Sequence, residues 1–187
     1  IMMQKFLICF FLLHAALTPT PVHATPQIQA ANDLIQNMIA DVENYLSKTS
    51  VETEKRKKDI TKLLDTYFDL PSVARFSAGP YWRAASETQR ASYTEIMRQV
   101  VINTVVRNFD RLIGLRFTLT NSQMKGKKMV LVRGTFRDAA GKNPPILVGW
   151  RVITPPSSPA KVLDVEIENI SMLVTQKQEN IAIVRQN

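Results

Sequence analysis

Residues 87–123, ETQRASYTEIMRQVVINTVVRNFDRLIGLRFTLTNSQ, contain the point at which the hydrophobic period of the chain changes. Up to Gly114 the apolar side chains recur at helical spacing, and Ser86 with Gln89 has the form of a capping box at the start. After Gly114, apolar and polar residues alternate, as they do along a half-buried strand. The sequence therefore predicts a long helix over 87–113 that leads into a sheet. Apolar residues occupy more than one stripe of this helix, so we expect it to pack against more than one neighbour.

The region after Gly114 predicts four strands, over 116–123, 128–138, 145–154 and 161–169. The stretches between them are short and rich in glycine, proline and serine, which is typical of turns. Because short turns can join only antiparallel neighbours, we expect an antiparallel meander.

The region before residue 87 predicts helices over 26–47, 51–69 and 71–78, and another helix begins near Val174. Helices first and strands afterwards is the α+β pattern. We therefore expect an α+β fold in which the N-terminal helices pack on a mainly antiparallel four-stranded sheet.

The first 24 of the 187 residues are typical of a cleaved secretory signal peptide. Lys5 precedes an apolar core at 6–13, and small residues end at Ala24. The apolar core is too short to span a bilayer, which needs about 20 residues. Without this segment, 25–187 has the length of one domain and a net charge of +7.

No histidine or cysteine follows residue 24. This removes the commonest general base, thiol catalysis and most zinc sites from the exported chain. The chain also has no GxSxG, SxxK or phosphate-binding glycine loop. Export argues against nucleic-acid binding. Two alternatives to a binding pocket remain open: an enzyme that uses Asp and Tyr, and a scaffolding protein with a filled core.

Acidic residues alternate along the fourth predicted strand. Asp164, Glu166 and Glu168 would face one side, and Leu163, Val165 and Ile167 the other. Calcium prefers six to eight oxygen ligands, and no turn motif here supplies the rest. We therefore interpret the acidic row as a solvent-exposed face and predict no metal site.

Within the segment 68–93, FDLPSVARFSAGPYWRAASETQRASY, the short stretch 76–82 contains three large aromatic residues between two apolar helices. These are Phe76, Tyr81 and Trp82. One interpretation is a core hinge in which Arg75 or Arg83 pairs with a carboxylate, since aromatic clusters are usually core.

This segment resembles the periplasmic phospholipid-binding proteins of Gram-negative bacteria, the soluble component of the Mla pathway, also called the toluene-tolerance family. The shared positions are Phe68-Asp69, Ala74-Arg75, Gly79, Tyr81-Trp82-Arg83, Ala85-Ser86 and Gln89-Arg90. A second match covers 162–179, VLDVEIENISMLVTQKQE. The sequence near 174–185 is more similar to a branch of the family associated with hopanoid biosynthesis. The chain departs from the family at Asn169, where glycine is usual, and it stops at Asn187, where relatives continue. We expect these departures to affect the closure of one end of the pocket.

The resemblance implies a cone-like fold whose helices and curved sheet enclose an apolar cavity. It also implies a non-enzymatic periplasmic carrier of phospholipid or a related lipid, without another cofactor. Such a carrier would move lipid between an outer-membrane lipoprotein–porin complex and an inner-membrane ABC transporter, and would maintain outer-membrane lipid asymmetry. The expected lining residues come from the aromatic segment, the long helix and the apolar strand face: Phe76, Tyr81, Trp82, Val101, Val105, Phe109, Val148, Trp150, Val165 and Ile167.

Overall fold

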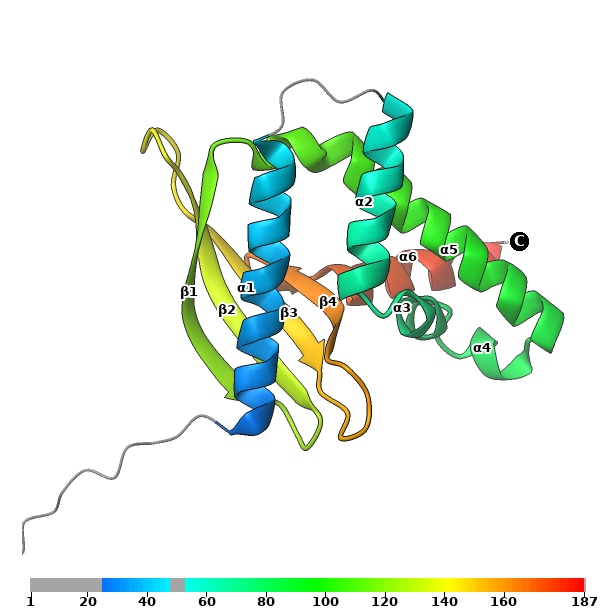
Figure 1. Ribbon diagram of the computed structural model, residues 1–187. Coiled ribbons are helices and arrows are strands. Elements are labelled where there is room, and N and C mark those ends of the chain that lie inside the picture. Colours follow the sequence, from blue (N-terminus) through cyan, green and yellow to red (C-terminus); the bar gives the residue numbers. More distant parts are fainter. Residues whose placement is uncertain (1–24, 48–52, 187) are drawn as a thin grey trace, which may run out of the picture.

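The computed structural model describes residues 25–47 and 53–186, so the expected signal peptide at 1–24 lies outside the described residues. Within these two described ranges, six α-helices, one 3-10 helix and five strands form an α+β fold, as predicted (Figure 1). The elements before the sheet are α1 (Pro26–Leu46), α2 (Thr53–Tyr67), α3 (Leu70–Ser77), α4 (Tyr81–Ala84), α5 (Glu87–Asn108) and η1 (Phe109–Leu112). The sheet and last helix are β1 (Leu115–Met124), β2 (Met129–Asp138), β3 (Ile146–Ile153), β4 (Lys161–Ile167), β5 (Ile170–Ser171) and α6 (Met172–Gln186).

The sheet is a curved antiparallel meander in the order β1-β2-β3-β4-β5 (Figure 1). The two-residue strand β5 adds a fifth member to the four strands that the sequence predicts. A bulge in β4 leaves Leu163 without a partner, because Val162 pairs with Val152 and Asp164 pairs with Arg151. The bulge resets the alternation of side chains along the strand.

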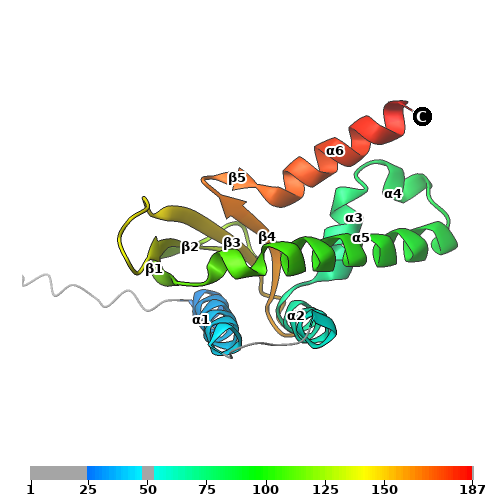
Figure 2. The same ribbon diagram turned by 90° about the horizontal axis from the view of Figure 1, so that it is seen from above.

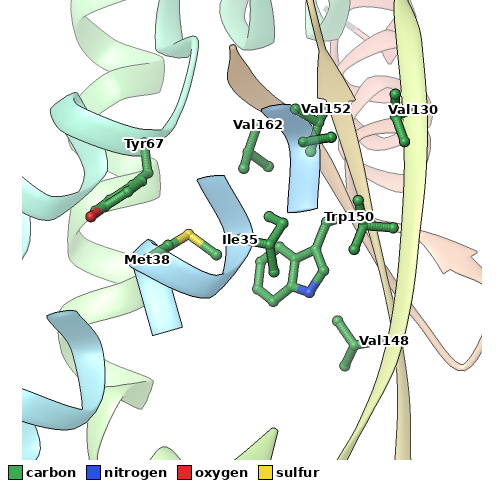
Figure 3. Close-up of a cluster of buried hydrophobic side chains, with 10 residues drawn as sticks. Ile35, Met38, Tyr67, Val130, Val148, Trp150, Val152 and Val162 are labelled. Carbon is green, nitrogen blue, oxygen red and sulfur yellow. The ribbon is translucent and has the colours of Figure 1, made fainter. Parts of the chain in front are cut away.

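Helix α1 lies on one face of the sheet, whereas β5 and α6 lie on the other side (Figures 1 and 2). Ala31, Ile35 and Met38 of α1 are buried against valines of the sheet and Trp150 (Figure 3). We call this set the sheet cluster. Its buried members are Ala31, Ile35, Met38, Tyr67, Val130, Val132, Val148, Trp150, Val152 and Val162.

A second apolar cluster joins α2 to α5 and η1. We call it the helix cluster, and its buried members are Tyr45, Ile60, Leu64, Leu70, Ile102 and Phe109. Two bidentate ion pairs fix the same helices at the surface: Arg98 with Asp65, and Arg56 with Asp110. The carboxylates raise the pKa of both guanidinium groups. The chain therefore has two buried apolar clusters, and both include residues of α1 and α2.

Helix α5 begins at the predicted capping box, in which Ser86 and Gln89 exchange hydrogen bonds. It packs against both α2 and α3, which confirms that the helix has more than one neighbour. The helix nevertheless leaves Ile96 60% exposed and Val100 41% exposed. It also ends earlier than predicted, at Asn108, and continues as η1.

The acidic row on β4 corrects the expectation of a solvent-exposed face. Asp164 and Glu166 are buried, because α6 and the Arg151 side chain cover this side of the sheet. Asp164 accepts hydrogen bonds from the Leu173 backbone N–H at 2.9 Å and from the Ser171 hydroxyl at 2.5 Å. Glu166 accepts from the Arg151 guanidinium at 2.8 Å. The two carboxylates therefore anchor the start of α6 and its neighbouring strand.

Candidate functional site: an apolar cavity between the sheet and the helices

A cavity of about 230 Å³ lies where the sheet cluster meets the helix cluster. Its walls come from α1, α2, the end of α5, η1 and one residue from each of β1, β2, β3 and β4. The lining residues are Met38, Ile39, Val42, Glu43, Leu46, Ile60, Leu63, Leu64, Tyr67, Phe68, Val105, Phe109, Leu112, Leu115, Phe136, Trp150 and Val165. All but Glu43 are apolar or aromatic, so the cavity suits a hydrocarbon chain.

Local sequence patterns place these walls. The α1 and α2 stripes recur every three or four residues, which directs Ile39 and Val42 of one helix and Leu63 and Tyr67 of the other inward. On the sheet, Trp150 pairs with Val165 across β3 and β4, so both side chains project from the same face. The apolar stripes of the two helices and the apolar face of the sheet therefore enclose one space.

Few polar atoms border the cavity. Glu43 is partly exposed and forms an ion pair with Arg116 at 3.2 Å. The Tyr67 hydroxyl donates to Asp41 Oδ2 at 2.5 Å, which connects α2 to α1. The Trp150 indole N–H is buried and has no hydrogen-bond partner among the residues that the structure describes. A buried donor without a partner costs about 1–3 kcal/mol, so an acceptor on a ligand would be favourable here.

Tyr67 lies in the cavity wall and has a raised pKa. Burial, and then the hydrogen bond to the Asp41 carboxylate, raises the pKa of Tyr67 to about 12. A phenol with so high a pKa keeps its proton throughout the physiological range and acts as a hydrogen-bond donor. It is therefore a poor general acid or base at neutral pH.

The structure brings four of the predicted site residues together at the cavity: Val105, Phe109, Trp150 and Val165. Two others pack behind it, since Val148 is buried in the sheet cluster and Val101 packs against the helix cluster. Ile167, near the end of β4, is 42% exposed.

The three predicted aromatic residues lie elsewhere. Phe76 and Trp82 line a separate groove between α3, α4 and α6, and Tyr81 and Trp82 line a further hollow beside α5. Arg75 and Arg83 are exposed, and neither forms an ion pair in the part of the chain that the structure describes, which corrects the expectation of a paired arginine in the core. Arg90 holds this segment instead, because it donates to the Trp82 carbonyl at 2.9 Å and to the Arg83 carbonyl at 3.1 Å.

Sequence reasoning missed the contribution of α1 and α2 to the cavity. Leu63, Tyr67 and Phe68 form part of the apolar stripe that predicts the helix over 51–69, but a stripe that faces a cavity has the same period as one that faces a filled core. Only the three-dimensional arrangement, which leaves a space between the two clusters, distinguishes a stripe that faces a cavity from one that faces a filled core.

The arrangement favours binding over a reaction. The buried carboxylates Asp164 and Glu166 are absent from the cavity lining and bond to Arg151 and the start of α6. Within residues 25–47 and 53–186, no group of acidic residues is placed to hold a metal ion. No helix in this described part is long and apolar enough to cross a membrane.

Comparison with known proteins identifies relatives of this fold. A model of the MlaC protein family matches residues 32–187, from within α1 to the end of the chain. A solved structure of a phospholipid-binding protein from Ralstonia solanacearum, in complex with a phospholipid, superposes with a TM-score of 0.67 at 15% sequence identity. The match covers 86% of this chain and 88% of that one, so the two share a fold. No curated protein matches the chain. Because the family model covers the helices, the sheet and the cavity between them, the chain belongs to the MlaC protein family.

Proposed function

We propose that this chain is a periplasmic lipid carrier in which residues 25–187 form a single lipid-binding domain. The observation that carries the proposal is the cavity, whose lining is apolar except for one ion-paired carboxylate. Two acyl chains of roughly 16 carbons cost on the order of 25 kcal/mol in water, at about 0.8 kcal/mol per CH₂. An apolar interior offsets that cost, so lipid can leave a bilayer for the protein. The family and the fold shared with a phospholipid-binding protein support this role.

The lipid would contact Val105, Phe109, Trp150 and Val165, together with the inward faces of α1 and α2. The buried indole N–H of Trp150 would donate to an oxygen of the ligand, such as an ester carbonyl. This contact would hold the polar end of an acyl chain at a defined depth.

The size of the cavity implies that it widens when lipid binds. At about 230 Å³ it is smaller than the roughly 300–1,000 Å³ of pockets for drug-sized ligands. Residues of both clusters line the cavity, so the cavity would widen where the clusters meet. The Tyr67–Asp41 hydrogen bond joins α2 to α1 beside the cavity and would stabilise the closed form.

A second part of the proposal concerns the transport of the bound lipid. The carrier would move phospholipid, or a related lipid such as a hopanoid, between an outer-membrane lipoprotein–porin complex and an inner-membrane ABC transporter. Membership of the MlaC family supports this role. The net charge of +8 favours approach to anionic membranes and acidic proteins. No chemical step is needed for such a task, and the carboxylate that lines the cavity, Glu43, is ion-paired with Arg116.

The direct test is the lipid content of the purified protein. The chain would be exported to the periplasm of a Gram-negative host, purified without detergent, denatured and extracted for mass spectrometry. We expect close to one lipid for each chain, and the mass identifies it as phospholipid or hopanoid. Protein that is consistently empty would contradict the proposal.

A matched pair of variants locates the lipid. Val105 lines the cavity and its neighbour Thr104 is exposed on the same helix. Val105→Gln places an amide in the apolar space and should reduce the bound lipid severalfold, whereas Thr104→Gln should leave it unchanged. Circular dichroism would verify that both variants fold. Equal lipid content in the two variants would place the lipid outside this cavity.

The transport role needs a separate measurement in the native bacterium. Depletion of the protein should change the distribution of pulse-labelled phospholipid between the inner and outer membranes. Restoration of the chain should reverse the change, whereas Val105→Gln should not. An unchanged distribution would leave a lipid-binding protein with another task.

A further inference from the structure

Trp82 and Arg83 of the YWR motif, together with Arg75 and Phe76, line a groove that shares no lining residue with the apolar cavity. The groove has a volume of about 530 Å³ and lies between α3, α4, β4 and α6. Its principal side chains are Arg75, Phe76, Trp82, Arg83, Leu163 and Lys177. This groove, which we call the cationic groove, needs an explanation other than the binding of acyl chains.

Three cations converge on the cationic groove without a compensating anion. Arg75 and Arg83 are exposed, and Lys177 of α6 lies 5.0 Å from the centre of the Phe76 ring. No carboxylate lines the groove among the residues that the structure describes. Like charges gathered in one hollow raise the local potential and attract an anionic partner.

The aromatic side chains add apolar surface to the same hollow. Phe76 is 41% exposed, although it lies between two packed helices, and Trp82 is half-buried. Aromatic residues and arginine are both enriched at protein–protein interfaces. Leu163, displaced by the bulge in β4, adds an aliphatic side chain to the lining.

The walls of the cationic groove are held in place by the elements beneath it. Arg90 lies 5.7 Å from the centre of the Trp82 ring and donates to the Trp82 carbonyl. A second network joins α3, α5 and α6, since the Tyr93 hydroxyl contacts Ser77 Oγ at 3.0 Å and accepts from Asn180 at 2.8 Å. A preorganised surface loses less conformational entropy on binding.

We propose that the cationic groove docks an acidic segment of a partner protein, one that carries a leucine-like or aromatic side chain among its carboxylates. The carboxylates would pair with Arg75, Arg83 and Lys177, and the apolar side chain would lie against Phe76 and Trp82. A hollow favours a projecting chain segment over a membrane, because a flat lipid surface contacts convex faces and cannot fill a groove. The proposal goes beyond lipid binding, and it holds whatever occupies the apolar cavity.

The test measures binding of a dye-labelled synthetic peptide of alternating glutamate and leucine, by fluorescence anisotropy with the full periplasmic protein. We expect saturable binding that weakens with added salt. A peptide with glutamine in place of glutamate should bind far more weakly. Phe76→Ala should also weaken binding, because it removes the apolar contact.

A matched pair of double variants separates the groove from general charge. Arg75→Gln with Arg83→Gln should weaken peptide binding roughly tenfold, the sum of two exposed charge contacts. Lys57→Gln with Lys58→Gln removes the same charge from an exposed part of α2 and should have little effect. The lipid content of both double variants should equal that of the parent, so this test does not depend on the outcome for the cavity.

Three results would overturn the proposal. The first is failure of the unaltered protein to bind the acidic peptide. The second is an equal loss of binding in the two double variants, which would indicate attraction by net charge alone. The third is binding to phosphatidylglycerol vesicles that depends on Arg75 and Arg83 while the peptide does not bind, which would assign the groove to a membrane surface.

Discussion

Asn169 shows how one residue type satisfies a backbone requirement at the turn between β4 and β5. Ile167 pairs with Ile170, so Glu168 and Asn169 form a two-residue hairpin loop, and their φ angles are 50° and 65°. Positive φ at both positions is the type I′ geometry, which favours asparagine and glycine. Asn169 therefore meets a conformational demand that glycine would also meet.

Asn169 yields a prediction about stability. Asn169→Gly should leave the free energy of unfolding nearly unchanged, whereas Asn169→Ala should lower it by about 1 kcal/mol, because alanine is strained at positive φ. Urea denaturation measures both. Asn103→Ala, on the exposed face of α5, is the control and should not destabilise, because alanine favours helix. An Asn169→Ala protein as stable as the parent would show that the turn does not hold this conformation.

Tyr67 yields a prediction about pH. Its pKa is about 12 in the folded protein and about 10 in the unfolded chain. The side chain is protonated in both states below pH 10, so its contribution to stability is complete there. Between pH 10 and 12 the unfolded chain releases the proton first, so the free energy of unfolding falls as pH rises. Urea denaturation at several pH values should show this loss in the parent and a smaller loss in Tyr67→Phe, and identical profiles would contradict the assignment.

Two side chains stabilise the start of α6. Ser171 immediately precedes the helix, and Asp164 lies on the neighbouring strand β4. The Ser171 hydroxyl accepts from the Val174 N–H at 3.0 Å, and Asp164 accepts from the Leu173 N–H and from Ser171. These acceptors satisfy backbone donors that the first turn of a helix leaves free. The stretch 162–179, which was the second region of resemblance to the family, therefore has the structural role of fixing the start of α6.

Asp164→Ala should lower the free energy of unfolding by about 2 kcal/mol or more, because it leaves a buried N–H without an acceptor and Arg151 without one of its partners. Hydrogen exchange of the α6 amides should accelerate more than exchange in α1. Glu179→Ala, on the exposed side of α6, is the matched control and should have little effect on either measurement. Unchanged protection of α6 in Asp164→Ala would mean that the helix docks by its apolar contacts alone.

The long elements could be predicted from periodicity, and their bounds agree with the structure to within a few residues, except at the end of α5. The four-residue helix α4 and the two-residue strand β5 could not, because neither is long enough to show a period. The acidic face of β4 was assigned to solvent because alternation alone does not show that α6 and Arg151 cover it. The expected lining combined the aromatic segment, the long helix and the apolar strand face. The long helix and the strand face contribute to the cavity, whereas the stripes of α1 and α2, which resemble ordinary core, take the place of the aromatic segment.

At the scale of the molecule, the chain separates two binding tasks. The apolar cavity lies between the two clusters, and the cationic groove lies between α3, α4, β4 and α6. Each site contains one of the two tryptophans of the chain, Trp150 in the cavity and Trp82 in the groove. Single-tryptophan proteins therefore report on the two sites separately.

Phospholipid with brominated acyl chains provides the corresponding test, because bromine quenches indole fluorescence only at short range. In Trp82→Phe the remaining Trp150 should be strongly quenched when the protein is loaded with brominated lipid, and ordinary lipid is the control. In Trp150→Phe the remaining Trp82 should keep its fluorescence, provided that circular dichroism shows a folded protein. The acidic peptide should change the emission of Trp82 and leave that of Trp150 unaffected. Quenching of Trp82 in place of Trp150 would put the acyl chains in the groove, beside Phe76, and would exchange the roles assigned to the two sites.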